Sequence, residues 1–377
     1  MRASREWTFF CIVTPGLEEL ALREFALKQE ALGIPLESVL PLKGGFEFRA
    51  SWELGRGALH LLKIPTRVLL RLEQVRARDF PKLFARLKAL PWGQYLTHPQ
   101  PLLKISCEEC RLMHTDRLAQ TLSEALAAHF KGAPLPLRWQ KEGLAPDTLF
   151  VRGVRDVFQL SLDLTGEALY KRGISVIKGE APLRENLASA LLLALFTTPA
   201  PASTPLRLWD PFCGSGTFLF EAAQFFHPSE RTFAYQRSIV NLGVAPWRPR
   251  APLQAWPVEE LRGTDLQAEL IKKLTPLGPG MSFAAQDFFT ARSENESNHP
   301  LWMIANPPYG ERLELAEGIR GFARRLAAHW QQQRPARSLI LVPASWPQLR
   351  LDGELPRRVV SFSNGGLAVE ARLWWRD

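Results

Sequence analysis

The sequence predicts an α/β protein whose second half forms a doubly wound parallel sheet and whose first half forms smaller α+β modules. Two patterns support this prediction: strands and helices alternate along the chain, and the last two strands are joined by Asn364-Gly365-Gly366, a hairpin signal. At 377 residues with 46% hydrophobic content, the chain also exceeds one ordinary core. We therefore expect two or three domains.

The first module is predicted over residues 1–65. A strand at Phe9–Val13 precedes Thr14-Pro15, which resembles a helix cap and first helical residue, and the helix then runs to about Gly33. Phe46–Arg49 alternates as a strand, and Ser51 can cap a second helix that ends before Pro65. These elements make a compact βαβα unit.

A second α+β module is predicted over residues 66–163. Its strands and helices alternate, with turn residues between them. They are the strand 68–72, the helix 80–90, the strand 102–107, the helix 115–130 and the strands 149–152 and 158–162.

Residues 164–205 read as a linker and an entry helix, Leu183–Phe196, that leads to the last domain, 206–377. The proline-rich stretch 198–205 is expected to be a surface loop. The candidate strands beyond it are 206–209, 261–263, 281–284, 301–305, 339–342, 359–362 and 367–374. A parallel sheet closed by a terminal hairpin is the expected topology.

The charge of the chain favours a polyanionic partner. The formal net charge is +9, and residues 51–100 contain nine Lys or Arg against three acids. A solvated basic face is the plain alternative for such a run. The candidate RNA-binding side chains are Arg76, Arg78, Lys82, Arg86 and Lys88, with Arg312 nearer the carboxyl end.

Four cysteines argue against a disulfide framework, and no segment has the length and apolarity of a membrane span. We therefore expect a cytoplasmic protein. Cys107 and Cys110 have metal-ligand spacing, but no second pair completes four ligands, so no metal is predicted.

Asn306-Pro307-Pro308-Tyr309, which ends the apolar run 301–305, is the most informative motif. The two prolines extend the backbone and remove two N–H donors, so carbonyls and the Asn306 amide are left to face a cleft. The Tyr309 ring can stack on a base. This pattern indicates methyl transfer to a planar amine, whereas a strand-ending turn is the alternative.

A glycine-rich turn follows the strand 206–209. Gly214 and Gly216 let a ligand approach the backbone, and the helix after them offers free N–H groups. Strand by strand, Asp265 then ends the next strand, where an acid can bind a ribose diol, and Asp287 follows where an adenine edge would lie. Taken alone, Asp265 or Asp287 could instead be a helix cap or a solvated carboxylate. The predicted cofactor-binding residues are Asp210, Pro211, Cys213, Gly214, Gly216, Thr217, Asp265, Asp287 and Asn306.

This series resembles the class I S-adenosylmethionine-dependent methyltransferases, and the run 306–312 is similar to the THUMP-domain-containing RNA guanine-N2 methyltransferases. The stretches 14–20, 169–173 and 181–187 add to the resemblance. It implies a Rossmann-like catalytic domain with a seven-stranded sheet, preceded by ferredoxin-like and THUMP modules. It also implies S-adenosyl-L-methionine as cofactor and Asn306, Pro307, Pro308 and Tyr309 as the catalytic tetrad.

The substrate that the resemblance implies is a guanosine of large-subunit ribosomal RNA. Three alternatives stay open: a tRNA methyltransferase, a DNA adenine methyltransferase with the same tetrad, and a non-catalytic RNA-binding assembly factor. Two departures from the family pattern are the Pro-, Arg- and Trp-rich stretch 227–258 and an early break at 275–280. The sequence predicts no oligomeric state.

Overall fold

The computed structural model describes residues 6–96, 100–131, 147–172, 183–237, 246–278, 280–292, 298–309 and 318–376. Contacts divide the chain into two compact units. The amino-terminal unit contains Met1–Ile12, Lys28–Leu169 and Ser229–Pro252, and the carboxyl-terminal unit contains Val13–Leu27, Tyr170–Pro228 and Leu253–Asp377. The chain therefore passes between the units five times.

The amino-terminal unit is built on one seven-stranded sheet, in the order β2-β3-β1-β4-β7-β6-β5. All its pairings are antiparallel except that of β5 with β6. The bounds are β1 Glu6–Ile12, β2 Val39–Leu42, β3 Gly45–Ser51, β4 Arg67–Arg76, β5 Leu102–Glu108, β6 Thr148–Val154 and β7 Val157–Asp163. Since β1 pairs with β4, the sheet continues across the boundary predicted at residue 65.

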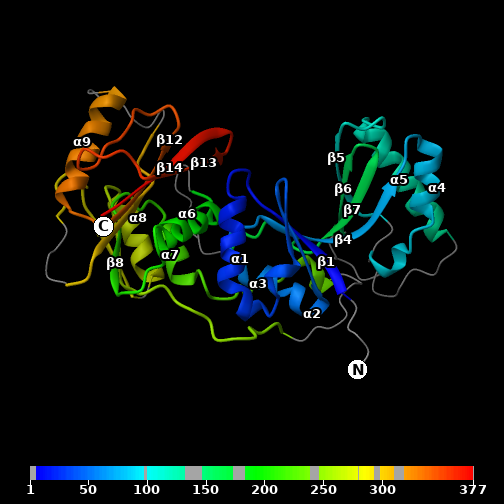
Figure 1. Ribbon diagram of the computed structural model, residues 1–377, viewed down its shortest axis with the longest axis horizontal. Helices are drawn as coiled ribbons and strands as arrows, with labels where there is room; N and C mark the ends of the chain where they lie inside the picture. Colours follow the sequence, from blue (N-terminus) through cyan, green and yellow to red (C-terminus); the bar gives the residue numbers. More distant parts are fainter. Residues whose placement is uncertain are drawn as a thin grey trace. The chain divides into compact units, whose positions relative to one another are not determined.

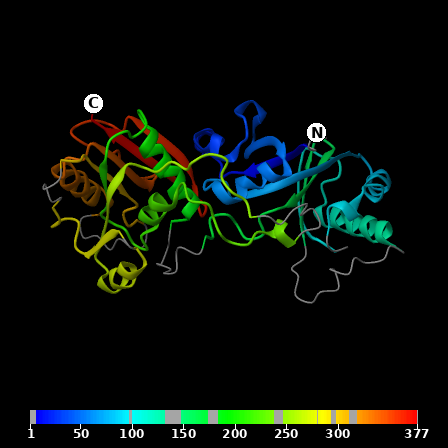
Figure 2. The ribbon, with the colours of Figure 1, turned by 90° about the horizontal axis from the view of Figure 1, so that it is seen from below.

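The helices of this unit pack on one face of the sheet. Helix α2 (Trp52–Gly55) lies beside the ring of Phe9, and α3 (Gly57–Leu61) contacts β4. Helices α4 (Phe80–Lys88) and α5 (Thr115–Phe130) cover Ile105 and Phe158. Figure 1 shows α4 and α5 on one side of β5–β7, and the pair, cyan to teal, again lies beside these strands in Figure 2. Burial alternates along β5 and β6, whereas β4 and β7 also bury consecutive residues, Val68–Leu70 and Leu160–Asp163.

The return segment, Ser229–Pro252, belongs to the amino-terminal unit although it follows α7 in the chain. Its described residues are 229–237 and 246–252. Trp247 stacks on His60, with ring centroids 5.7 Å apart, and the backbone N–H of Tyr235 donates to the Leu164 carbonyl over 3.1 Å. The stretch 227–258, which fits no family pattern in the sequence, thus supplies core aromatic rings to the first unit.

The carboxyl-terminal unit is built on a second seven-stranded sheet, in the order β10-β9-β8-β11-β12-β14-β13. The first five strands are parallel, and β14 and β13 are antiparallel. The bounds are β8 Leu206–Asp210, β9 Val258–Asp265, β10 Met281–Ala285, β11 Leu301–Ala305, β12 Arg337–Pro343, β13 Arg358–Asn364 and β14 Leu367–Trp375. This confirms the predicted seven-stranded parallel sheet with a terminal hairpin.

Helices cover both faces of the second sheet. Helix α9 (Gly318–Gln332) buries Phe322, Leu326 and Trp330 against β8, β11 and β12, and Figure 1 shows α6 (Glu185–Thr197) and α7 (Thr217–Gln224) on the other side. Helix α8 (Ala268–Leu274) contacts β9 and β10, and the first part of α1 (Glu18–Leu32) also groups with this unit. In the part of the chain that the structure describes, no helix has the length and apolarity to cross a membrane.

Candidate active site

The candidate active site lies at the carboxyl ends of the parallel strands β8, β9, β10 and β11. The strand order reverses between β8 and β11. From β8 the chain adds β9 and β10 on one side, and β11 and β12 then follow on the other side. In open α/β sheets ligands bind outside the carboxyl ends of the strands at such a switch point. Asp210, Asp265 and Asn306 end or directly follow three of these strands, as the sequence predicts.

The turn after β8 exposes backbone at two glycines. Gly214 has φ +49° and nothing within 4 Å of where a Cβ would stand, so this position opens onto free space. Gly216 has φ +75°, begins α7 and leaves no room for a Cβ, because Phe220 would lie 2.9 Å away. Both residues therefore need glycine for conformation, and Gly214 also lets a ligand approach. Pro211 and Thr217 are buried beneath this turn.

The Asp265 carboxylate ties the turn to β9. Its Oδ2 accepts a hydrogen bond from the Gly214 N–H at 2.9 Å, and its Oδ1 accepts one from the Gln267 N–H at 3.0 Å. Each carboxylate oxygen can accept two hydrogen bonds, so both oxygens keep capacity for a ligand. The side chain is half-buried. Its fixed position fits the predicted contact with a diol.

Asp210 is buried at the floor of the site, only 1% exposed. Its Oδ1 accepts from the Phe212 N–H at 3.1 Å. Burial raises the pKa of the Asp210 carboxyl well above its ordinary value, and the charge of Asp265 raises the pKa further. Burial likewise raises the pKa of the Cys213 thiol, which is therefore no nucleophile at neutral pH. A cationic ligand in this site would favour the ionised form of Asp210.

Asn306 follows β11 directly, and its Oδ1 is buried with no hydrogen-bond partner among the described residues. Buried acceptors are rarely left unpaired, and such an atom in a native structure calls for an explanation. Pro307 is buried, whereas Pro308 and Tyr309 are half-buried, and Tyr309 packs against the core cluster that contains Trp209 and Phe288. The tetrad thus presents an amide oxygen and an aromatic ring at the same edge of the sheet.

Asp287 caps the turn that follows β10. Its Oδ1 accepts from the Phe289 N–H at 3.0 Å, and its carbonyl accepts from the N–H groups of Thr290 and Ala291. The capping role that the sequence left as an alternative is therefore present. Contact with an adenine edge stays a prediction, in which the half-buried rings of Phe289 and Phe212 are the neighbouring apolar surface.

Two contributors to this site were not predicted. Phe283 on β10 lies beside Gly216 and Gly263, where it covers the glycine turn. Glu221 on α7 pairs with Arg172 at 2.6 Å in a buried ion pair, side chains 1% and 4% exposed. Glu221 is an acid flanked by apolar residues, Phe220 and Ala222, within this helix, and this anomaly was the available signal.

The predicted RNA-binding residues lie in the amino-terminal unit, on β4, the turn after it and α4. Arg76, Lys82, Arg86 and Lys88 are exposed, and Arg78 pairs with Asp156 at 3.1 Å. Lys82 lies 3.5 Å from Asp79, the cap of α4. Arg312 lies outside the described residues, as does the rest of 310–317.

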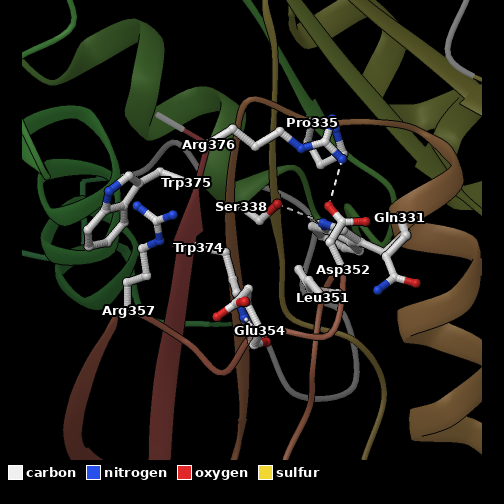
Figure 3. A pocket seen from close by; sticks show the side chains of 11 residues that line it. Gln331, Pro335, Ser338, Leu351, Asp352, Glu354, Arg357, Trp374, Trp375 and Arg376 are labelled. Atoms are coloured by element: carbon white, nitrogen blue, oxygen red, sulfur yellow. Dashed lines mark hydrogen bonds and ion pairs between the residues drawn. The ribbon is translucent and has the colours of Figure 1, made fainter.

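A pocket of about 100 Å³ lies at the opposite edge of the second sheet (Figure 3). It is formed near Ser338 at the amino end of β12 and near Trp374 on β14, and Arg376 closes one side through a 2.7 Å ion pair with Asp352. None of the predicted site residues lines it. This pocket is therefore separate from the carboxyl edge that carries the candidate site.

The strand order, the terminal hairpin and the glycine turn after β8 define a class I methyltransferase domain. The whole chain superposes on the crystal structure of a putative methyltransferase complexed with SAH, with a TM-score of 0.75, 20% identity and coverage of 100% of this chain and 99% of that one. At this identity the likeness establishes the fold.

Residues 172–345 match the family described as RMKL-like, methyltransferase domain. It is 27% identical, over 85% of its length, to the Ribosomal RNA large subunit methyltransferase K/L of Magnetococcus marinus, and covers 46% of that protein. It is 26% identical to a putative RNA methyltransferase of Synechocystis sp., covering 83% of that relative. The chain thus spans about half the length of the first relative and most of the second.

Proposed function

We propose that this protein transfers a methyl group from S-adenosyl-L-methionine to the exocyclic N2 amine of a guanosine in large-subunit ribosomal RNA. The buried, unpaired Oδ1 of Asn306 at the switch point carries the proposal, because an amine N–H would satisfy it. The name of the Magnetococcus marinus relative supports ribosomal RNA as the substrate. The function fits a cytoplasmic protein, and residues 66–163 are proposed as the RNA-binding THUMP module.

The residues of the carboxyl edge fit S-adenosyl-L-methionine. The open position at Gly214 admits a ligand against the backbone, and the fixed Asp265 carboxylate suits a ribose diol. A positively charged group of the cofactor beside Asp210 would lower the raised pKa of this buried carboxyl and favour its ionised form. The bound cofactor supplies a methyl group made electrophilic by its sulfonium.

The chain contributes position and desolvation. A guanine amine is a poor nucleophile because its lone pair is delocalised into the ring. We infer that Asn306 Oδ1 and the Pro307 carbonyl accept hydrogen bonds from the two amine N–H groups and so aim the nitrogen lone pair along the line of attack. The Tyr309 ring would stack on the base, a contact worth about 1–3 kcal/mol.

A base within a helix cannot reach the buried Oδ1 of Asn306, so the target guanosine must be single-stranded or flipped out of its stack. The exposed cations on α4 and β4 offer phosphate contacts that do not depend on sequence. RNA would thus be held by the first unit and methylated by the second.

Incubation of the purified protein with methyl-labelled cofactor tests the proposal. The RNA should come from a strain that lacks the gene, separated into ribosomal and transfer RNA, and the modified residue should be mapped by mass spectrometry. We expect N2-methylguanosine in large-subunit RNA. Label in tRNA alone would show that the substrate is tRNA and not ribosomal RNA. The absence of label from both fractions would favour a binding factor without activity.

A further inference from the structure

The sheet of the amino-terminal unit has a second face that is free of helices among the described residues. Residues paired directly across neighbouring strands point to the same side of a sheet. Phe9, Leu70 and Leu162 form one such series, and they share the face of Val151, which α4 and α5 cover. The neighbouring residues of each strand therefore belong to the opposite face.

The opposite face carries a row of four paired residues from β4 to β5: Arg71, Ser161, Phe150 and Lys104. The next row has the same order of strands and is entirely polar. It consists of Gln74, Gln159, Arg152 and Ser106. The half-buried Phe150 thus lies between Ser161 and Lys104 in its row, with the Arg67 guanidinium 6.0 Å from its ring centroid, and beside a band of amide, guanidinium and hydroxyl groups.

The cations of this face are placed against aromatic rings. Lys104 Nζ lies 5.2 Å from the centroid of Phe150, and the Arg71 guanidinium lies 4.1 Å from the centroid of Phe10. Arg71 is fixed by Glu47 at 2.6 Å and by the Ser161 hydroxyl at 3.2 Å. A guanidinium held in place loses little freedom when it meets a further ligand.

The sheet curls toward this face. Lys43, in the turn between β2 and β3 at one edge, pairs with Glu108 at the end of β5 at the other edge, at 3.0 Å. Such a contact across seven strands requires strong curvature, and the helices lie on the other face. The helix-free face is therefore concave.

We infer that this concave face is a second RNA-contact surface, which binds a single-stranded segment through a base stacked on Phe150. Every base has a π-face, so an aromatic ring flanked by cations recognises single strands without needing their sequence. Among the paired residues of β4 to β7, this face carries five cations against two carboxylates, a balance that suits a phosphate backbone. The cations are Arg67, Arg71, Arg76, Lys104 and Arg152, and the carboxylates are Asp163 and Glu108. The inference rests on the proposed RNA-methylating function.

The test compares Phe150→Leu with Phe130→Leu, which makes the same change at a half-buried residue that ends α5. Fluorescence anisotropy would measure the affinity of each full-length protein for a labelled twelve-residue oligouridine and for a twelve-base-pair RNA duplex. Loss of one stacked base should weaken oligouridine binding at least about five-fold. Duplex binding should change less than two-fold, and Phe130→Leu should bind both RNAs as the parent does.

A charge variant gives a second, independent measurement. Lys104→Gln should lower the slope of log affinity against log salt on oligouridine by about 0.7, the value for one phosphate contact to a single strand. Lys131→Gln, at the exposed end of α5, is the matched control and should keep the slope. Ultraviolet cross-linking of the parent protein should join oligouridine to the peptide that contains Phe150.

Oligouridine binding within two-fold of the parent for Phe150→Leu would overturn the inference. An equal loss for duplex, or a changed oligomeric state with unchanged RNA affinity, would also overturn it, since the face would then bind duplex or another protein copy. The labelled-cofactor assay separates the two proposals. If the parent protein methylates RNA but Phe150→Leu binds oligouridine as the parent does, this surface alone is refuted. If Phe150→Leu weakens oligouridine binding but the parent protein methylates no RNA, the catalytic proposal alone is refuted.

Discussion

At the residue scale, Asn306 combines two properties that normally exclude each other. Its Oδ1 is buried, yet it has no hydrogen-bond partner among the described residues. A buried unpaired acceptor costs about 1–3 kcal/mol of stability. Position 306 thus sacrifices stability for an acceptor that is free to meet a substrate amine.

Replacement of this side chain should separate catalysis from folding. Asn306→Ala should lower the methyl-transfer rate at least about 100-fold, the loss typical when one preorganised polar group is removed from a reacting centre. Thermal stability should stay equal or rise, because an unpaired acceptor leaves the core, and cofactor affinity by calorimetry should stay within a few-fold. Activity within a few-fold of the parent would remove Asn306 from the mechanism.

Asp265 should act on the cofactor instead. Asp265→Ala removes the acceptor of the Gly214 and Gln267 N–H groups and the predicted diol contact, so the dissociation constant for S-adenosylhomocysteine should rise at least about ten-fold in calorimetry. Asp265→Asn keeps the shape and one acceptor and should fall between Ala and the parent. Near-parental affinity of the Ala variant would show that the carboxylate is only a structural link.

At the element scale, the sequence signals that succeeded were those with a local physical cause. The hairpin of β13 and β14 was predicted from Asn364-Gly365-Gly366, and both glycines adopt positive φ, +61° and +92°. The glycine turn after β8 and the acid that ends β9 were predicted because their residue types suit only a few backbone geometries.

Other elements were not predicted from the sequence, because the residues that stabilise them are distant in the chain. Strand β2 contains Pro41 and is mostly exposed, so neither composition nor alternation marks it as a strand. The return segment has no periodic pattern, and it folds against α3 and the residues that follow β7 through contacts 60 to 190 residues away in the sequence. Helix α9 did carry a signal, since Phe322, Leu326 and Trp330 recur every fourth residue.

The return segment should respond to pH through His60. Its ring lies 3.0 Å from the Ser229 carbonyl and 3.0 Å from the Tyr235 hydroxyl, and burial, with a smaller effect of the nearby Arg56, lowers its pKa. The unfolded imidazole, with a pKa of about 6.5, then binds more protons than the folded one. His60 therefore stabilises the docked segment above pH 6.5, and this contribution is lost as the pH falls through the folded pKa.

Limited proteolysis would measure this effect. Cleavage within residues 229–252, mapped by mass spectrometry, should be faster at pH 5.5 than at pH 7.5 in the parent protein. His60→Gln cannot titrate and provides the correction for the activity of the protease at each pH. Equal pH dependence in both proteins would show that His60 does not control the segment.

At the scale of the whole molecule, the two units divide the proposed work, yet the chain passes between them five times. Val13–Leu27 belongs to the carboxyl-terminal unit and the return segment to the amino-terminal one. A fragment that begins at residue 170 would therefore lack Val13–Leu27 of the second unit. It would also keep the return segment without the rest of the amino-terminal unit, against which that segment packs. Experiments on RNA binding should use the full chain, in which both units are complete.

The basic surface of β4 and α4 is then best tested through salt dependence. Replacement of Arg76, Arg78 and Lys82 by Gln should weaken RNA binding and reduce the slope of log affinity against log salt by at most about two, since each phosphate contact to a single strand contributes about 0.7. Arg78 should contribute least because Asp156 already pairs with it. Replacement of the exposed Arg324, Arg334 and Arg350 in the other unit removes the same charge and should leave the slope nearly unchanged. Equal slopes for the two triple variants would mean that net charge attracts RNA, and that β4 and α4 are ordinary solvated surface.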